Sequence, residues 1–282
     1  MALTACRAAV LDARGPVGQA EKTILIDSLA IMLAIVVPTI LATLGFAWWY
    51  RASNVRARYL PEWASSGRVE LVVWAIPAMV IILLGGVTWI GAHVLDPAKP
   101  LAARTPPVNI EVVSLDWKWL FIYPQQGVAS VNELVVPAGV PLHFSLTSAS
   151  VMNAFFVPQL GSMIYTMNGM VTQLNLQADA AGIFRGLSAH YSGEGFSDMH
   201  FQVRAVPVEQ FAAWISATRG NGPELNSENY AALAKPSINM APETFGSVAV
   251  SLFSNVVTQK LAPGPGPRAE HSGAIQAPAG AQ

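Results

Sequence analysis

The sequence predicts a two-helix transmembrane hairpin followed by an all-β sandwich with additional C-terminal helices. Two long runs without charged residues lie in the N-terminal third of the chain. From Val108 onward apolar residues alternate with polar ones, which is the period of β-strands. The chain of 282 residues has a mean hydropathy of +0.41, and 12% of its residues are charged. It is therefore more apolar than an ordinary soluble protein.

Composition and charge exclude several functions. The formal net charge is -1, so there is no electrostatic basis for nucleic-acid binding. Cys6 is the only cysteine. Because one thiol cannot supply two ligands, the chain cannot form an internal disulfide, a cysteine-based zinc site or a copper centre with two thiolates.

The N-terminal segment, residues 1–23, carries a candidate lipidation site. Residues 3–6 read Leu-Thr-Ala-Cys, a pattern at which bacterial lipoproteins are cleaved and acylated, here on Cys6. Only five residues precede Cys6, so the basic and apolar regions of a signal peptide are absent. Two alternatives stay open: the start is placed too late, or Cys6 is an unprocessed free or buried cysteine.

Residues 24–96 predict the transmembrane hairpin, with spans at about 26–50 and 71–94. The charge-free run from Ser28 to Tyr50 has 23 residues, more than the roughly 20 needed to cross the hydrocarbon core. It ends in two tryptophans and a tyrosine, which suit the membrane interface. The second charge-free run extends from Leu71 to Leu95. A buried helical hairpin of a soluble protein is the alternative, but it leaves the interfacial tryptophans unexplained.

The connector, residues 51–70, carries four arginines and two glutamates. By the positive-inside rule it is cytoplasmic, which places both termini and the following domain on the outer face of the membrane. Glu70 opens the second span. Its simplest role is that of an interfacial anion at a helix N-terminus.

Residues 105–206 predict the β domain. Short alternating runs begin at Val108, Leu142, Gln173 and Met199, and glycines and prolines separate them, which predicts an antiparallel sandwich or barrel. Residues 207–260 predict a helical and aromatic C-terminal segment, with one helix after Pro207 and a short helix over residues 226–234. Residues 261–282, rich in Gly, Pro and Ala, predict a disordered tail.

The stretch from Ile183 to Val203 has the form of a metal-binding loop that leads into a strand, but it lacks the ligands. Ser188 and Ser192 stand four residues apart, where two bridging thiolates would fit, and Phe196 follows. A bridged copper site needs sulfur and imidazole ligands. Neither a serine hydroxyl nor a phenyl ring replaces them.

Several motifs resemble subunit II of the haem–copper respiratory oxidases, from about Gly15 to Lys260. The motifs are Arg68-Val-Glu-Leu-Val-Val-Trp-Ala-Ile-Pro77, Asp116-Trp-Lys-Trp119 with Tyr123, Ser150-Val-Met-Asn-Ala-Phe-Phe-Val-Pro158 with Leu160-Gly161, and the stretch 183–203. The resemblance implies a cupredoxin-like fold for the sandwich. It also implies contact with subunit I, for which Trp117 and Trp119, on one face of a predicted strand, are the candidates.

Relatives that oxidise cytochrome c hold a dinuclear copper centre, and the resemblance carries its ligands onto this sequence one by one. The early histidine falls on Asn153, the first cysteine on Ser188, the glutamate carbonyl ligand on His190, the second cysteine on Ser192, the second histidine on Phe196 and the methionine on Met199. Met199 alone is retained, so no metal is expected in this chain. A weak mononuclear copper site at His190 and Met199 is the alternative, although it would lack the cysteine and second histidine of a type-I site.

This pattern of loss resembles the quinol oxidase branch, the bo-type ubiquinol oxidases. The implied complex is proton-translocating; it oxidises ubiquinol and reduces oxygen to water. This chain would be its supporting subunit II, without catalytic residues. Haem b, a haem of o or a type and a single copper would lie in subunit I, with subunits III and IV and membrane lipid as further partners. In the family, Glu70 would lie at the entry of a proton path.

Two other functions stay open. The first is a copper-bearing cytochrome c oxidase subunit II, against which the cysteine count argues. The second is a membrane-anchored periplasmic scaffold or binding module that works outside any oxidase.

Overall fold

The computed structural model describes residues 9–58, 60–103 and 105–261. The chain divides into two units, residues 20–96 and a β-rich unit to which residues 9–19 also belong. Cys6 and residues 262–282 of the predicted tail lie outside the described residues. Lipidation of Cys6 and disorder of the tail therefore stay predictions.

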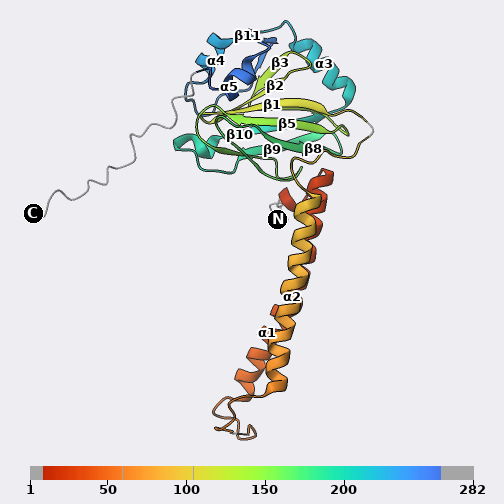
Figure 1. Cartoon of the computed structure of the whole chain (residues 1–282), viewed down its shortest axis with the longest axis vertical. Coiled ribbons are helices and arrows are strands. Elements are labelled where there is room, and N and C mark those ends of the chain that lie inside the picture. Colours follow the sequence, from red (N-terminus) through yellow and green to blue (C-terminus); the bar gives the residue numbers. More distant parts are fainter. Residues whose placement is uncertain (1–8, 59, 104, 262–282) are drawn as a thin grey trace, which may run out of the picture. The chain divides into compact units, whose positions relative to one another are not determined.

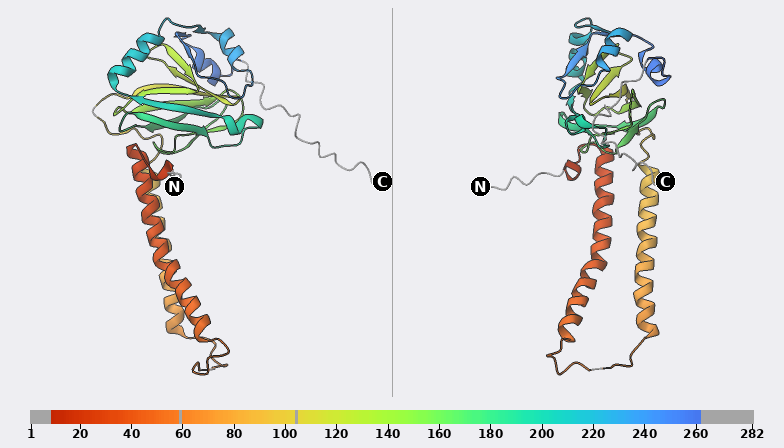
Figure 2. Two further views of the ribbon diagram at one scale, coloured as in Figure 1. Left: turned by 180° about the vertical axis from the view of Figure 1, so that it is seen from behind. Right: turned by 90° about the vertical axis from the view of Figure 1, so that its left-hand side faces the viewer.

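The hairpin unit consists of two long apolar helices, α1 (Pro16–Trp49) and α2 (Gly67–Val94), joined by the connector (Figure 2). Their 34 and 28 residues extend over about 50 and 40 Å, and both are long and apolar enough to cross a membrane. Each continues through an internal proline. Helix α1 begins well before the predicted span. The charged residues near its start oppose burial in the hydrocarbon core of a membrane, but they do not prevent helix formation. Proline also suits the first turn of a helix.

The second unit is a β domain with short helices. Its strands are β1 (Val108–Leu115), β2 (Lys118–Tyr123), β3 (Val128–Val131), β4 (Glu133–Pro137), β5 (Leu142–Ser148), β6 (Asn153–Phe156), β7 (Ile164–Thr166), β8 (Thr172–Leu176), β9 (Gly182–Ser188), β10 (His200–Val206), β11 (Glu224–Leu225), β12 (Glu243–Phe245) and β13 (Ser247–Val248). Its helices are η1 (Ala9–Leu11), η2 (Glu194–Asp198), α3 (Val208–Thr218), α4 (Ser227–Leu233) and α5 (Leu252–Val257).

Two sheets form the sandwich (Figure 1). One has the order β12-β3-β2-β1-β5-β8 and the other β4-β10-β9-β6-β7, while β11 and β13 form a separate small pair. Each large sheet contains one parallel pair, β1 with β5 and β4 with β10. The predicted antiparallel pairing is therefore wrong for these two pairs, although the predicted sandwich is present. Alternation of apolar residues reports which face of a strand is buried, and it carries no information on strand direction.

The central strands of the six-stranded sheet are buried on both faces. Trp119, Phe121 and Tyr123 of β2 belong to the core between the two sheets. Leu120 and Ile122 belong to a second core with residues of the C-terminal segment, whose helices α4 and α5 lie over this sheet (Figure 1). Because both faces are covered, all six residues of β2 are buried and the strand shows no alternation of apolar and polar residues.

Two buried polar side chains attach the C-terminal segment to the sandwich. Lys118 Nζ donates to Lys235 O at 2.7 Å and to Ser237 Oγ at 2.6 Å. Asn132 Nδ2 donates to Met240 O at 2.9 Å. The segment is thus an integral layer of the domain.

Residues just before α1 and in its first turn pack on the β domain. Arg14 N donates to Gln159 O at 2.7 Å, and Gly18 N donates to Leu160 O at 3.1 Å. A Cβ atom on Gly15 would lie 2.2 Å from Gln177 O, so this close approach requires glycine.

Candidate functional site

The residues that correspond to the lost ligands gather at one end of the sandwich. Asn153 is the first residue of β6. Ser188 is the last residue of β9 and pairs with Phe155 of β6. Ser188 N donates to Met199 O at 3.0 Å, which closes the loop between them. The first part of the stretch 183–203 is therefore strand β9 and not loop, contrary to the prediction. Its side chains point alternately to core and solvent, but the two glycines at 182 and 186 interrupt the apolar pattern.

Asn153, Ser188 and His190 form a small hydrogen-bonded network. Ser188 Oγ lies 3.1 Å from Asn153 Oδ1 and 3.3 Å from His190 O, and its proton can be donated to either. Asn153 Nδ2 donates to Val151 O at 3.3 Å. Asn153 is 1% and Ser188 is 3% exposed. These buried polar groups are neutral and satisfy one another.

Ser192 and Met199 meet beside this network. Ser192 Oγ lies 3.9 Å from Met199 Sδ, and both residues are buried. Trp117 Nε1 donates to Ser192 O at 3.0 Å. The Trp117 ring also covers Gly195, where a Cβ atom would approach it to 2.4 Å. Trp117 thereby fixes the loop that carries Ser192.

Trp117 and Trp119 do not share a strand face, contrary to the prediction. Trp117 lies in the turn between β1 and β2 with φ 64, and this left-handed residue breaks the alternation. Trp119 is 0% exposed, and its ring packs 5.4 Å from Phe155 and 5.6 Å from Phe201 between centroids. Trp119 therefore offers no surface to a partner. Contact between Trp117 and subunit I stays a prediction.

The two remaining ligand positions hold half-buried aromatic side chains. The His190 ring contacts Tyr165 edge-on at 5.8 Å, and the Phe196 ring contacts Tyr191 at 5.6 Å. Glu70 does not belong to this site: it lies exposed in the first turn of α2, where its N–H donates to Ser66 O at 2.9 Å. Its role in proton uptake stays a prediction.

The donors at this end of the sandwich do not fit a dinuclear copper centre. They are an amide, two hydroxyls, one imidazole and one thioether, and the bridging thiolates are missing because Cys6 is the only cysteine of the sequence. Within residues 9–261, leaving aside positions 59 and 104, no cluster of three or more His, Cys, Asp or Glu could hold a metal ion.

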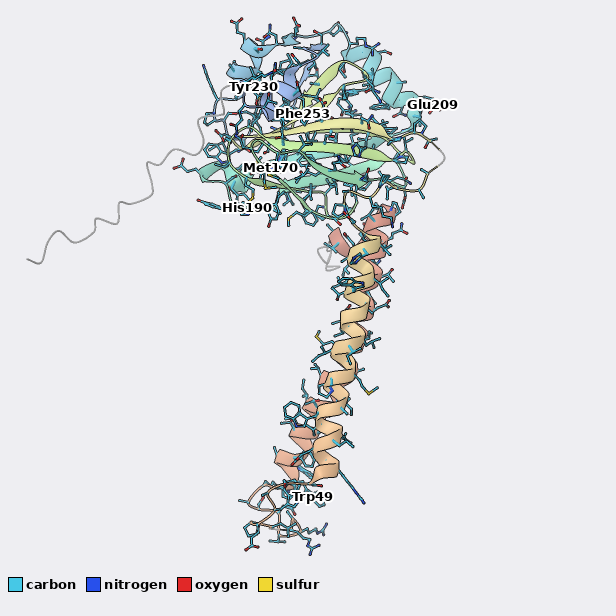
Figure 3. All side chains as sticks on the ribbon, viewed as in Figure 1. Trp49, Met170, His190, Glu209, Tyr230 and Phe253 are labelled. Carbon is cyan, nitrogen blue, oxygen red and sulfur yellow. The ribbon has the colours of Figure 1, made fainter. Side chains whose placement is uncertain are left out.

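Exposed apolar side chains occur in and next to β6, β7 and β9 at this end of the domain, and they are not part of the predicted site. Met152, Met163, Tyr165, Met170 and Tyr191 are between 38% and 73% exposed. We call these five residues the methionine surface. Figure 3 shows Met170 and His190 towards the same end of the domain. A sequence signal exists, because no Asp, Glu, Lys or Arg occurs between Glu133 and Asp179.

Comparison with known proteins agrees with this architecture. Residues 110–206 match the family model "Cytochrome C oxidase subunit II, periplasmic domain", and residues 219–264 match "COX Aromatic Rich Motif". The chain is 49% identical over 259 residues to ubiquinol oxidase subunit 2 of Acetobacter aceti, covering 91% of this chain and 84% of the relative. It is 47% identical over 257 residues to cytochrome bo(3) ubiquinol oxidase subunit 2 of Pseudomonas aeruginosa, covering 91% and 78%. It is 36% identical over 231 residues to quinol oxidase subunit 2 of Bacillus cereus, covering 82% and 79%.

Two apolar helices followed by this periplasmic domain define the class: subunit II of a haem–copper oxidase, an oxidoreductase complex. Within that class the chain belongs to the family of ubiquinol oxidase subunit 2. The resemblance drawn from the sequence motifs and the cupredoxin-like sandwich are thereby confirmed. The matches favour the quinol oxidase interpretation over a copper-bearing cytochrome c oxidase subunit and over a module outside an oxidase.

Proposed function

We propose that the chain is a copper-free, structural subunit II of a proton-translocating complex that oxidises ubiquinol and reduces oxygen to water. Catalysis takes place in subunit I, which holds haem b, a haem of o or a type and a single copper. The observation that carries this proposal is the hydrogen-bonded network of Asn153, Ser188 and His190 at the ligand positions. These groups satisfy one another without a cation, as buried polar groups must.

The absence of a copper centre that would pass electrons from the outer surface is consistent with quinol as the electron donor. Cytochrome c is a soluble protein that delivers electrons at the outer surface, so an oxidase that uses it needs a metal near that surface. Quinol dissolves in the membrane and can reduce a haem there directly. A subunit II without copper is therefore sufficient for a quinol oxidase, although it would disable a cytochrome c oxidase.

The methionine surface supports contact between the β domain and subunit I. Large exposed apolar patches mark protein contacts, and methionine adapts readily to the shape of a partner. Met170→Glu places a charge on this surface and is expected to reduce the amount of subunit I that copurifies with the chain. Val208→Glu is the matched control, since Val208 is 51% exposed and its neighbour Glu209 lies away from Met170 (Figure 3). Equal recovery of subunit I with both variants would contradict this contact.

The charge of the connector supports one orientation in the membrane. The four arginines of the connector support a cytoplasmic connector, with the β domain and both termini in the periplasm of a bacterial inner membrane. The proposal has three further parts. Cys6 is acylated, a proton path begins at Glu70, and the chain contacts subunits III and IV and membrane lipid.

Deletion of the chain tests the proposed function. Membranes without it are expected to lose quinol-dependent oxygen uptake, and its re-expression should restore the uptake. Unchanged uptake would favour a module that works outside the oxidase. Copper analysis of the purified chain tests the remaining alternative. Two copper ions per chain would indicate a cytochrome c oxidase subunit, whereas a single copper ion would indicate the mononuclear site at His190 and Met199.

A further inference from the structure

A pocket of about 780 Å³ lies where α1 passes into the connector. Its walls include Phe46, Tyr50, Leu60 and Trp63 together with the side chains of Arg51 and Arg58. This volume is within the range of about 300–1,000 Å³ that is typical of small-molecule sites. No Asp or Glu is among the described residues that line it. The pocket thus combines apolar walls with two uncompensated positive charges.

Hydrogen bonds hold Arg51 in place at one side of this pocket. Arg51 Nη1 donates to Trp48 O at 3.0 Å, Arg51 Nε donates to Ser53 Oγ at 3.0 Å, and the guanidinium lies 4.8 Å from the centroid of the Trp48 ring. Asn54 Nδ2 donates to Trp49 O at 2.6 Å and thereby links the connector to the last residue of α1. A guanidinium has five N–H groups, so Arg51 retains donors for a ligand.

Arg58 provides the second charge. It is exposed, and in the part of the chain that the structure describes it makes no hydrogen bond or ion pair. Guanidinium groups bind phosphate oxygens through strong, charge-assisted hydrogen bonds. Because the pocket adjoins the end of an apolar helix that can cross the membrane, a phosphate on a lipid can reach both arginines while its acyl chains remain in the hydrocarbon.

We propose that this pocket binds an anionic phospholipid. Its headgroup phosphate contacts Arg51 and Arg58, and the first carbons of its acyl chains lie against Phe46, Leu60 and Trp63. A zwitterionic headgroup binds less well, because its ammonium group finds no carboxylate in the walls. This inference depends on the hairpin being in a membrane and not on the reaction of the oxidase, so its failure leaves the proposed function untouched.

Native mass spectrometry of the purified oxidase complex, titrated with phosphatidylglycerol or phosphatidylethanolamine, tests the proposal. Arg58→Gln is expected to weaken binding of phosphatidylglycerol about tenfold or more, the usual effect of losing hydrogen bonds to a charged group. Arg56→Gln is the matched control, because Arg56 lies in the same connector and carries the same charge but does not line the pocket. Its effect measures the general attraction of the connector for anionic lipid.

Several results would overturn the proposal. Equal losses with Arg56→Gln and Arg58→Gln would indicate diffuse electrostatic attraction without a site. Equal binding of the two lipids by the unaltered complex would show that the charge of the headgroup is not recognised. Unchanged binding in Trp63→Ala would show that the apolar walls are not used. A photo-crosslinker in place of Leu60 that labels another subunit instead of lipid would show that a protein occupies the pocket.

Discussion

Replacement of Lys118 by methionine should change the pH dependence of folding of the β domain. Lys118 is 1% exposed, and its ammonium group donates to Lys235 O and Ser237 Oγ of the C-terminal segment. Burial lowers the pKa of Lys118 from 10.5 to about 8, and the nearby Asp116 carboxylate opposes this shift in part. The protonated form is therefore destabilised in the folded domain.

The size and sign of the effect follow from this shift. The difference between 10.5 and about 8 corresponds to about 3 kcal/mol at 1.36 kcal/mol per pKa unit. Between these two pH values the unfolded chain binds more protons than the folded chain, so the stability contribution of Lys118 rises with pH. The free energy of unfolding of the unaltered chain should increase relative to that of Lys118→Met by about 2 to 3 kcal/mol from pH 7 to pH 10.

Urea unfolding of the full-length chain in detergent, followed by tryptophan fluorescence at several pH values, measures this difference. Lys235→Met is the matched control, because it removes an exposed lysine but keeps the carbonyl group that Lys118 contacts. Burial raises the pKa of Tyr123 and Tyr230, but both residues occur in all three proteins and their effects cancel. A parallel pH dependence in the unaltered chain and Lys118→Met would refute the reasoning, as would the loss of this dependence in Lys235→Met.

Three further predictions concern the lost ligand positions, strand β9 and the hairpin. Ser188→Cys combined with Ser192→Cys should not create a purple dinuclear copper centre, since both imidazole ligands remain missing; a stable visible spectrum after copper addition would contradict this. Gly186→Ala should destabilise the domain by about 1 to 3 kcal/mol in urea unfolding, because a Cβ atom would lie 2.1 Å from the ring of Phe201; unchanged stability would argue against this contact. Glu70→Gln should slow oxygen uptake by the complex if Glu70 admits protons, and an unchanged rate would leave it a role at the helix terminus only.

The parts of the fold that the sequence predicts well are those with one buried face or a long apolar run. The two spans are evident from uncharged stretches of sufficient length. Strands β5 and β10 alternate because one face of each meets the core and the other is more open. Helix α4 begins next to Asn226, whose side chain accepts hydrogen bonds from Glu228 N and Asn229 N, as its residue type predicts.

The features that the sequence did not predict depend on contacts between distant segments. Strand β2 shows no alternation because the C-terminal segment covers its second face. The left-handed turn at Trp117 is not evident from its residue type, because tryptophan seldom adopts positive φ. The position of Trp117 over Gly195 and the hydrogen bonds between Asn153 and Ser188 join parts of the chain that only the folded sandwich brings together.

The reductant specificity of the purified complex tests the central claim most directly. Oxygen uptake is measured with ubiquinol and, separately, with reduced cytochrome c, on the same preparation. The hydrogen-bonded, thiol-free end of the sandwich predicts rapid uptake with ubiquinol and none above background with cytochrome c. Rapid oxidation of cytochrome c without added quinol would contradict it, because electrons would then enter through a relay for which this chain supplies no ligands.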